Sequence, residues 1–219
     1  MVMVSTIGAY TSSTIVDDLE LQILVGQRLP HERLVEDDLM SEYNAKRHVV
    51  RQALQELEYR ELVDRKPKVG SFVRAYDAQQ ISDLYELRSI VERECALRIE
   101  LPATSNAIAQ LRRIQRLHDD AVRLDDLRGT IEHNISFHEY LYGLSSNVFL
   151  VDAVKRYARM TYSTRSITVA HRARSGRSAA EHSAMIVALE AGDLQALAKL
   201  CHDHLQPARE TYLRMLRSR

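Results

Sequence analysis

Three histidines in the C-terminal half of the chain lie on apolar faces of three separate predicted helices. At about 100° per residue, His138, His182 and His204 each share a face with large apolar side chains, as His182 does with Met185 and Leu189. Burying several unpaired imidazoles costs desolvation free energy. A divalent cation would satisfy all three, because neutral imidazole is a common metal ligand. The pattern predicts a metal site, with ordinary core histidines as the alternative.

Three other histidines of this half have simpler interpretations. His118 lies on the stripe of Leu111 and Ile114 and is interpreted as a core residue. His133 and His202 fall on more polar helical faces, so we expect both to be solvated.

A permanent cation also lies on an apolar face. Arg88 stands within the apolar stripe of a helix predicted over 79–100. A guanidinium on a core face needs an anion, because an unpaired buried charge is costly. Two sources are open: an internal carboxylate such as Glu139 or Asp152, or the carboxylate of a small ligand that bridges Arg88 and the metal. On the second interpretation Arg88 is an effector-binding residue.

The charge distribution indicates a different chemistry near the N-terminus. The chain holds 30 Lys and Arg and 30 Asp and Glu, so its net charge is zero. Residues 46–74, however, hold 8 basic and 4 acidic side chains, whereas residues 1–45 hold 2 basic and 8 acidic ones. This short segment could face a polyanion while the rest of the chain does not, although a solvated charged surface would look the same.

The basic segment begins with a helix whose N-terminal end carries hydrogen-bond donors. In a helix-turn-helix, this end of the second helix reaches base edges in the major groove. An arginine fork fits the O6 and N7 atoms of guanine, and Arg47 and Arg51 project from one helical face. The candidate DNA-binding residues at this end are Lys46, Arg47, His48 and Arg51.

Three more residues complete the predicted DNA surface. Arg33 comes just before the middle helix and is placed for the phosphate backbone. Lys68 lies at the tip of a predicted hairpin beside Gly70, where it can approach a phosphate or the minor groove closely.

The elements that must position these residues are mostly helices. The chain has only 7 Gly and 4 Pro, and Leu, Ala, Arg and Glu are frequent, which favours helix over a Rossmann fold or a β-sandwich. Apolar spacing predicts helices over 12–25, about 35–43 and about 46–59, and two strands at 62–65 and 71–74. Three helices and a β-hairpin indicate a winged helix-turn-helix.

We expect the rest of the chain to form an antiparallel bundle of about six helices. They are predicted at roughly 79–100, 105–126, 130–143, 147–164, 178–191 and 194–216. Gly129 and the polar stretch Arg172–Arg177 are among the predicted breaks. We therefore expect two domains, residues 1–76 and 77–219.

Composition excludes several classes of protein. With 45% apolar residues the chain can bury cores, so a disordered protein is excluded. No apolar run is long enough for a membrane span, and Met1–Thr6 shows no export signal. The two cysteines, Cys95 and Cys201, cannot form a disulfide framework. We expect a cytoplasmic protein with reduced thiols.

Three segments resemble the DNA-binding domain of GntR-type bacterial transcription regulators. They are Leu29–Leu34, Asn44–Leu54 and Val69–Val73. The resemblance implies that Arg33, Arg47, Arg51 and the glycine region of the hairpin contact a short palindromic DNA operator, bound by a homodimer.

The match has departures. The family usually has Gly, Ser or Thr, and Pro where this chain has His31, Lys46 and Val49. The hydroxyl that usually caps the reading helix is therefore absent at position 46, at a cost of ~1 kcal/mol.

Other segments resemble the FCD effector domain that follows GntR-type winged helices. They are Asn134–His138, Glu181–Leu189, Gly192–Asp193 and His204–Leu205. The family binds a divalent metal, often zinc or nickel, through an Asp and three His, which match Asn134, His138, His182 and His204. Here an amide replaces the acidic ligand. The family's effectors are mostly small organic acids, which favours a ligand carboxylate at Arg88.

Together these features predict a ligand-responsive transcription regulator, a repressor released by an organic acid, and not an enzyme. One alternative is a metal-free helical interaction domain tethered to DNA. The other is a metal-dependent hydrolase, which the absence of a His-Glu-x-x-His helix disfavours.

Overall fold

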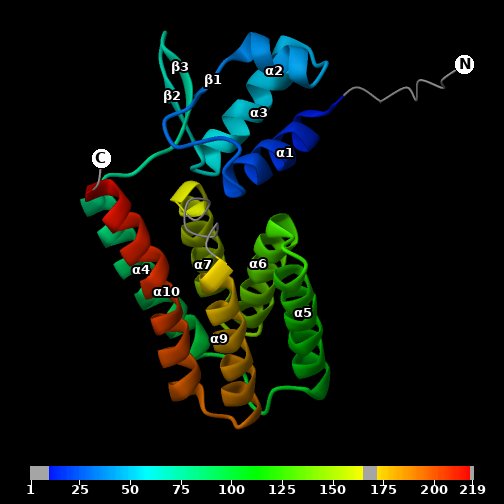
Figure 1. Ribbon diagram of the computed structural model, residues 1–219, viewed down its shortest axis with the longest axis vertical. Coiled ribbons are helices and arrows are strands. Elements are labelled where there is room, and N and C mark those ends of the chain that lie inside the picture. The colour runs from blue at the N-terminus through cyan, green and yellow to red at the C-terminus, as the bar shows by residue number, and fades with distance from the viewer. Residues whose placement is uncertain (1–9, 165–171, 218–219) are drawn as a thin grey trace, which may run out of the picture. The chain divides into compact units, whose positions relative to one another are not determined.

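The computed structural model describes residues 10–164 and 172–217, and the chain divides into two compact units, Met1–Ala75 and Tyr76–Arg219 (Figure 1). Each unit has its own core and is described by itself. The predicted absence of an export signal concerns residues that lie outside the described part of the chain.

The N-terminal unit is a winged helix-turn-helix. Its elements are α1 (Ser12–Leu24), β1 (Arg33–Leu34), α2 (Glu36–Glu42), α3 (Arg47–Tyr59), β2 (Val63–Lys66) and β3 (Gly70–Val73). The strands form an antiparallel sheet in the order β1-β3-β2. The three helices and the hairpin confirm the sequence prediction. The strand β1 was not predicted, because two residues carry no recognisable alternation.

Apolar side chains at helical spacing hold this unit together. They are Ile15, Leu19 and Ile23 of α1, Leu39 of α2, and Val50, Leu54 and Leu57 of α3, all buried as predicted. The helix α1 starts with a reciprocal cap, in which the side chains of Thr11 and Thr14 each accept the backbone N–H of the other. This packing fixes α3 against α2, so the N-terminal end of α3 faces solvent beside the first turn of α2.

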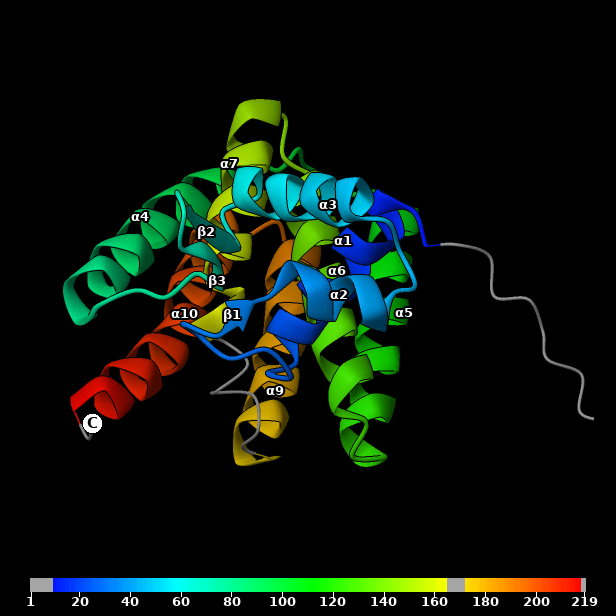
Figure 2. The same cartoon turned by 90° about the horizontal axis from the view of Figure 1, so that it is seen from above.

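The C-terminal unit consists of long helices. They include α4 (Ala78–Ala96), α5 (Ser105–Arg123), α6 (Leu127–Gly143), α7 (Val148–Met160), α9 (Arg172–Glu190) and α10 (Leu194–Arg217). Figures 1 and 2 show α4 beside α10 and α5 beside α6. The helix α9 packs against both α5 and α10. The predicted helical bundle is therefore confirmed.

Two predicted helix breaks are wrong. The helix α6 starts at Leu127, because the Asp126 side chain caps it by accepting the N–H of Gly129 at 2.9 Å. The helix α9 starts at Arg172 and runs through Gly176. A glycine inside a helix costs only ~1 kcal/mol, which tertiary packing can offset.

Every helix named above contributes side chains to the core of the C-terminal unit. Fully buried members include Cys95, Leu111, Phe137, Met185 and Leu197. A smaller cluster around Tyr85 and Tyr212 joins α4 to α10. None of the described helices is long and apolar enough to cross a membrane.

Candidate metal centre and nucleic-acid interface

Three histidines converge inside the C-terminal unit. The Nε2 atom of His138 lies 3.1 Å from Nε2 of His204 and 3.2 Å from Nε2 of His182. These side chains come from α6, α10 and α9, and among the described residues they form a group whose ligand atoms all lie within 4.8 Å of one another. His182 is fully buried and His204 nearly so. The structure therefore brings the three predicted histidines together.

The outer nitrogens of two of these rings have hydrogen-bond acceptors. Nδ1 of His182 donates to Oε1 of Gln115 at 2.9 Å, and Nδ1 of His204 donates to Oε2 of Glu181 at 2.7 Å. Gln115 is oriented in turn, because its amide nitrogen donates to Asp119 at 2.7 Å. A neutral ring that carries its proton on Nδ1 has a lone pair on Nε2. Both rings are thus held with their metal-binding nitrogen facing His138.

Glu181 is held as a carboxylate. Burial acts to raise its pKa, but hydrogen bonds from His204 and Arg177 outweigh burial, so the pKa of Glu181 lies below its usual value. Arg177 reaches the second carboxylate oxygen from one helical turn earlier, at 2.7 Å. A negative charge therefore stands directly behind the ring of His204.

This donor set fits a divalent cation. Zinc holds imidazole nitrogens at about 2.0–2.1 Å, so two nitrogens of a tetrahedral set lie about 3.3 Å apart. The observed separations of 3.1 and 3.2 Å are close to that value. Asn134, one turn before His138 on α6, is buried, and its Oδ1 accepts a hydrogen bond from Ser178 at 3.4 Å. An amide oxygen can coordinate a cation but brings no charge.

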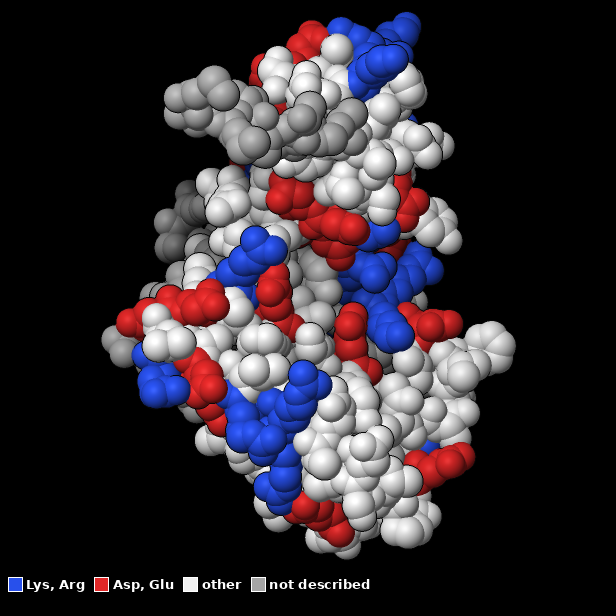
Figure 3. Space-filling model, turned by 90° about the vertical axis from the view of Figure 1, so that its right-hand side faces the viewer, with Lys and Arg blue, Asp and Glu red and all other residues white. Residues whose placement is uncertain are grey.

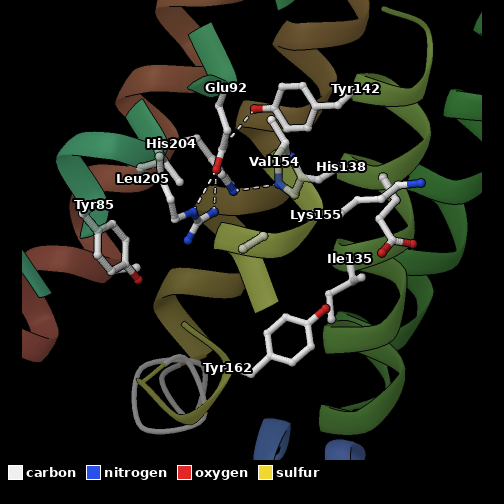
Figure 4. A pocket seen from close by; sticks show the side chains of 14 residues that line it. Tyr85, Glu92, Ile135, His138, Tyr142, Val154, Lys155, Tyr162, His204 and Leu205 are labelled. Carbon is white, nitrogen blue, oxygen red and sulfur yellow. Dashed lines mark hydrogen bonds and ion pairs between the residues drawn. The ribbon is translucent and has the colours of Figure 1, made fainter. Parts of the chain in front are cut away.

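A cavity of about 40 Å³ lies beside the histidines (Figure 4). It is lined by Tyr85, Arg88, Glu92, Ile135, His138, Glu139, Tyr142, Val154, Lys155, Ala158, Tyr162, His204, Leu205 and Ala208. In the close view, the rings of His138 and His204 approach each other at one side and Glu92 meets the hydroxyl of Tyr142 at another. Aromatic, basic and acidic groups thus share one small space with the candidate ligands.

Arg88 already has an internal anion, and it is Glu92. Nε and Nη2 of Arg88 both reach Oε1 of Glu92 at 2.8 Å, and Nη1 donates to Thr161 at 2.9 Å. The expectation that Glu139 or Asp152 supplies the internal carboxylate is therefore wrong, since both side chains are exposed. Glu92 stands one turn after Arg88 on α4, and this i, i+4 spacing was the signal that could have found it.

Three further histidines of the C-terminal unit lie outside this group. His118 is a buried core residue, as expected, and burial lowers its pKa. His133 is partly exposed. The expectation of a solvated His202 is wrong, because Nδ1 of this half-buried ring hydrogen-bonds with the hydroxyl of Ser89 where α10 packs on α4.

In the N-terminal unit, four of the predicted DNA-binding residues lie at the start of α3. Lys46 is the N-cap residue and forms no side-chain cap, as its type implies. Lys46, Arg47, His48 and Arg51 are all exposed. Acidic residues of α2 face the two arginines: Arg47 pairs with Glu36 and Asp37, and Arg51 pairs with Glu36. Sequence spacing did not reveal these pairs, which join separate helices.

The hairpin brings the other three predicted residues together. Arg33 of β1 donates through Nη2 to the carbonyl of Val69 at 2.8 Å, because β1 pairs with β3. Gly70 has a φ of +131°, and a Cβ there would lie 3.1 Å from Nε of Arg33. Glycine suits this position for two reasons. A residue with a side chain rarely adopts this φ value, and its Cβ would crowd the guanidinium of Arg33. Lys68 is exposed at the tip.

Basic and acidic side chains alternate in groups on one face of the molecule (Figure 3). On the face drawn in Figure 3, blue Lys and Arg side chains form several separate groups with red Asp and Glu side chains beside them. This pattern accords with the net charge of zero. Any attraction for a polyanion must therefore arise locally rather than from the whole molecule.

Comparison with known proteins matches both units. Residues 11–73 match the gntR family of bacterial regulatory proteins, and residues 83–207 match the FCD domain. The Nta operon transcriptional regulator of Aminobacter aminovorans is 29% identical over 126 residues, which are 58% of this chain and 60% of that protein. The match thus spans less than two thirds of that regulator's length.

Solved structures share the fold. One is a GntR transcriptional regulator from Rhodococcus sp. RHA1, with a TM-score of 0.78 and 23% identity over 92% of this chain and 97% of that chain. Another is McbR/YncC of E. coli, with a TM-score of 0.80 and 18% identity over 99% of each chain. At these identities the likeness establishes the fold alone.

Proposed function

This chain belongs to the GntR family of bacterial regulatory proteins and carries an FCD domain, so it is a DNA-binding transcription regulator, and we propose that its C-terminal unit senses a small organic acid through a divalent metal ion. The observation that supports the metal most directly is the approach of three Nε2 atoms to 3.1 and 3.2 Å. Zinc or nickel is the proposed ion, since both accept imidazole nitrogen.

The ligands would be His138, His182 and His204, with the amide oxygen of Asn134 as a fourth. Gln115 and Glu181 hold two of the rings in the tautomer that binds metal. When bound, the metal supplies a positive charge that can hold a carboxylate. The negative charge of Glu181 partly replaces the one that Asn134 does not provide.

The acid effector would occupy the cavity beside the histidines. Arg88 lies in its wall, and an effector carboxylate would bind there as a second anion beside Glu92. Lys155 of α7 lines the same cavity and adds a second cationic group. The free volume of about 40 Å³ holds only a few waters, so a larger acid must displace side chains, and this coupling between ligand and packing can transmit binding.

The DNA-binding side rests on Arg33, Lys46, Arg47, His48, Arg51, Lys68 and Gly70. We propose that these residues bind half of a short palindromic operator within a cytoplasmic homodimer. Binding of the acid would then change the spacing between the α3 helices of the two subunits and release the DNA, so that the protein acts as a repressor. A coupling of ~2–3 kcal/mol would change operator affinity roughly 30–150-fold.

Metal analysis and thermal melting of the purified full-length chain test this proposal. We expect bound zinc or nickel after purification without chelator, and a melting temperature that falls when the metal is removed. A protein that carries no metal and melts equally with and without chelator would be a metal-free helical domain tethered to DNA. Metal-dependent turnover of an ester or amide would instead indicate a hydrolase.

A further inference from the structure

Acidic residues of α2 pair with Arg47 and Arg51 of α3 in different ways. Arg51 uses only Nε, which donates to both carboxylate oxygens of Glu36 at 3.0 and 2.9 Å. Its two terminal amino groups donate no hydrogen bond among the residues that the structure describes. The Arg51 side chain as a whole is 58% exposed.

Arg47 has the opposite arrangement. Its Nη1 pairs with Glu36 at 3.3 Å, and its Nη2 pairs with Asp37. Both terminal amino groups therefore already face carboxylates. To present its fork to another group, Arg47 must first leave Asp37.

Guanine offers two acceptors, O6 and N7, on its major-groove edge. Two N–H groups on the same side of a guanidinium match this edge bidentately. In Arg51 the terminal edge formed by Nη1 and Nη2 is open, whereas the carboxylate of Glu36 occupies Nε on the other side. Such a carboxylate does not compete with the base, and it fixes the plane of the guanidinium and removes rotamer freedom before binding.

We propose that Glu36 is a positioning residue that holds Arg51 as the guanine-reading arginine of this protein. The proposal rests on the contact between Arg51 and DNA proposed above. It separates the two arginines: Arg51 reads a base while still paired with Glu36, and Arg47 must exchange its carboxylates for DNA.

The competing interpretation is that Glu36 acts only through its negative charge. In that case Glu36 lowers the affinity of the protein for every DNA duplex by the same factor, because its charge repels phosphates whatever the sequence. Asp38 provides a matched control. It lies in the same first turn of α2 and is exposed, and the structure shows no ion pair for it among the described residues.

The test uses the full-length chain and a palindromic duplex that the wild-type protein selects from a random library. Affinity is measured by fluorescence anisotropy on this duplex and on versions in which one symmetric G·C pair at a time becomes A·T. The readout is the ratio of the two affinities at each position. The variants are R51A, E36Q, E36A, D38N and the double variant R51A/E36Q, all checked for native melting temperature.

We expect R51A to reduce discrimination at one symmetric G·C position by roughly five-fold or more, as the loss of a bidentate pair implies. E36Q and E36A should reduce discrimination at that same position, and E36Q should have no further effect on it in the R51A background. D38N should tighten binding to all duplexes equally and leave every ratio unchanged.

Two results would overturn the inference. One is an E36Q protein that behaves as D38N does, with all affinities shifted alike. The other is an R51A protein that keeps its discrimination at every G·C position. A wild-type protein that selects no sequence at all would instead contradict the DNA-binding proposal itself.

Discussion

Nε2 of His138 lies 3.1 Å from Nε2 of His204, although 66 residues separate them along the chain. The Nδ1 proton of His204 is donated to Glu181, so Nε2 carries a lone pair when this ring is neutral. Two facing lone pairs repel, so a proton on one ring or a cation is needed between these nitrogens. His182 approaches the same point, and a single proton on His138 would be shared between two acceptors. A divalent cation would accept a lone pair from each of the three rings.

Metal should stabilise the fold. With zinc or nickel at 100 times its Kd, the free energy of unfolding should rise by about 2.7 kcal/mol, because the metal binds only the folded arrangement. Urea unfolding with metal and with chelator measures this difference. His138→Ala should abolish it, whereas His133→Ala, on the same helix but partly exposed, should retain it. Equal stabilisation of the two variants would place the metal elsewhere.

Restoring an acidic ligand should tighten metal binding. Asn134→Asp adds a negative charge one turn from His138, and we expect an affinity gain on the order of tenfold. Competition with a coloured chelator at fixed pH measures the Kd. An unchanged Kd would mean that residue 134 does not contact the ion.

The carboxylate behind His204 should matter to the metal although it does not touch it. Glu181→Gln keeps the shape of the side chain but loses the charge, and metal affinity should fall by roughly 10–100-fold. Glu139→Gln is the control, because this exposed carboxylate lines the same cavity. If both variants lose affinity equally, the effect comes from net charge and not from the contact with His204.

The buried ion pair of α4 should be costly to break. Arg88 and Glu92 have side chains only 6% and 3% exposed, so Glu92→Gln leaves a buried guanidinium without its counter-charge. We expect the free energy of unfolding to fall by about 3 kcal/mol, measured in urea. Glu94→Gln, on the same helix, breaks solvent-exposed pairs and should leave stability nearly unchanged. Similar losses in the two variants would show that the Arg88 charge is compensated in another way.

Neither cysteine should react while the protein is folded. Burial raises the pKa of the Cys201 thiol to about 12 and also raises that of Cys95. The reactive thiolate of Cys201 is then about one molecule in ten thousand at pH 8, whereas an unfolded thiol with a pKa near 8.5 is substantially ionised. A chromogenic disulfide reagent should detect no thiol in native protein and both thiols in denaturant. Rapid labelling of the native chain would show that this core opens.

Local periodicity was enough to predict the elements and what they bury. Ile15, Leu19 and Ile23 repeat at the spacing of one helical face, and the structure buries all three. The same rule placed each candidate metal-binding histidine on the inner face of its helix. Periodicity failed at β1, which has two residues, and at Gly129, where a capping side chain sets the start of the helix. These features depend on single contacts and not on a repeat.

Only the tertiary structure decided which side chains meet. Glu181 reaches His204 from another helix, Gln115 reaches His182, and Glu36 reaches Arg51 across the turn between α2 and α3. The sequence determines which face of a helix is buried, because that face is fixed by the residues of the helix itself. It does not determine the rotation and height at which two helices pack, and a shift of one turn, about 5.4 Å, exchanges one polar partner for another. The sequence alone therefore determined the two kinds of domain, whereas packing between helices decided the charge behind His204 and the carboxylate on Arg51.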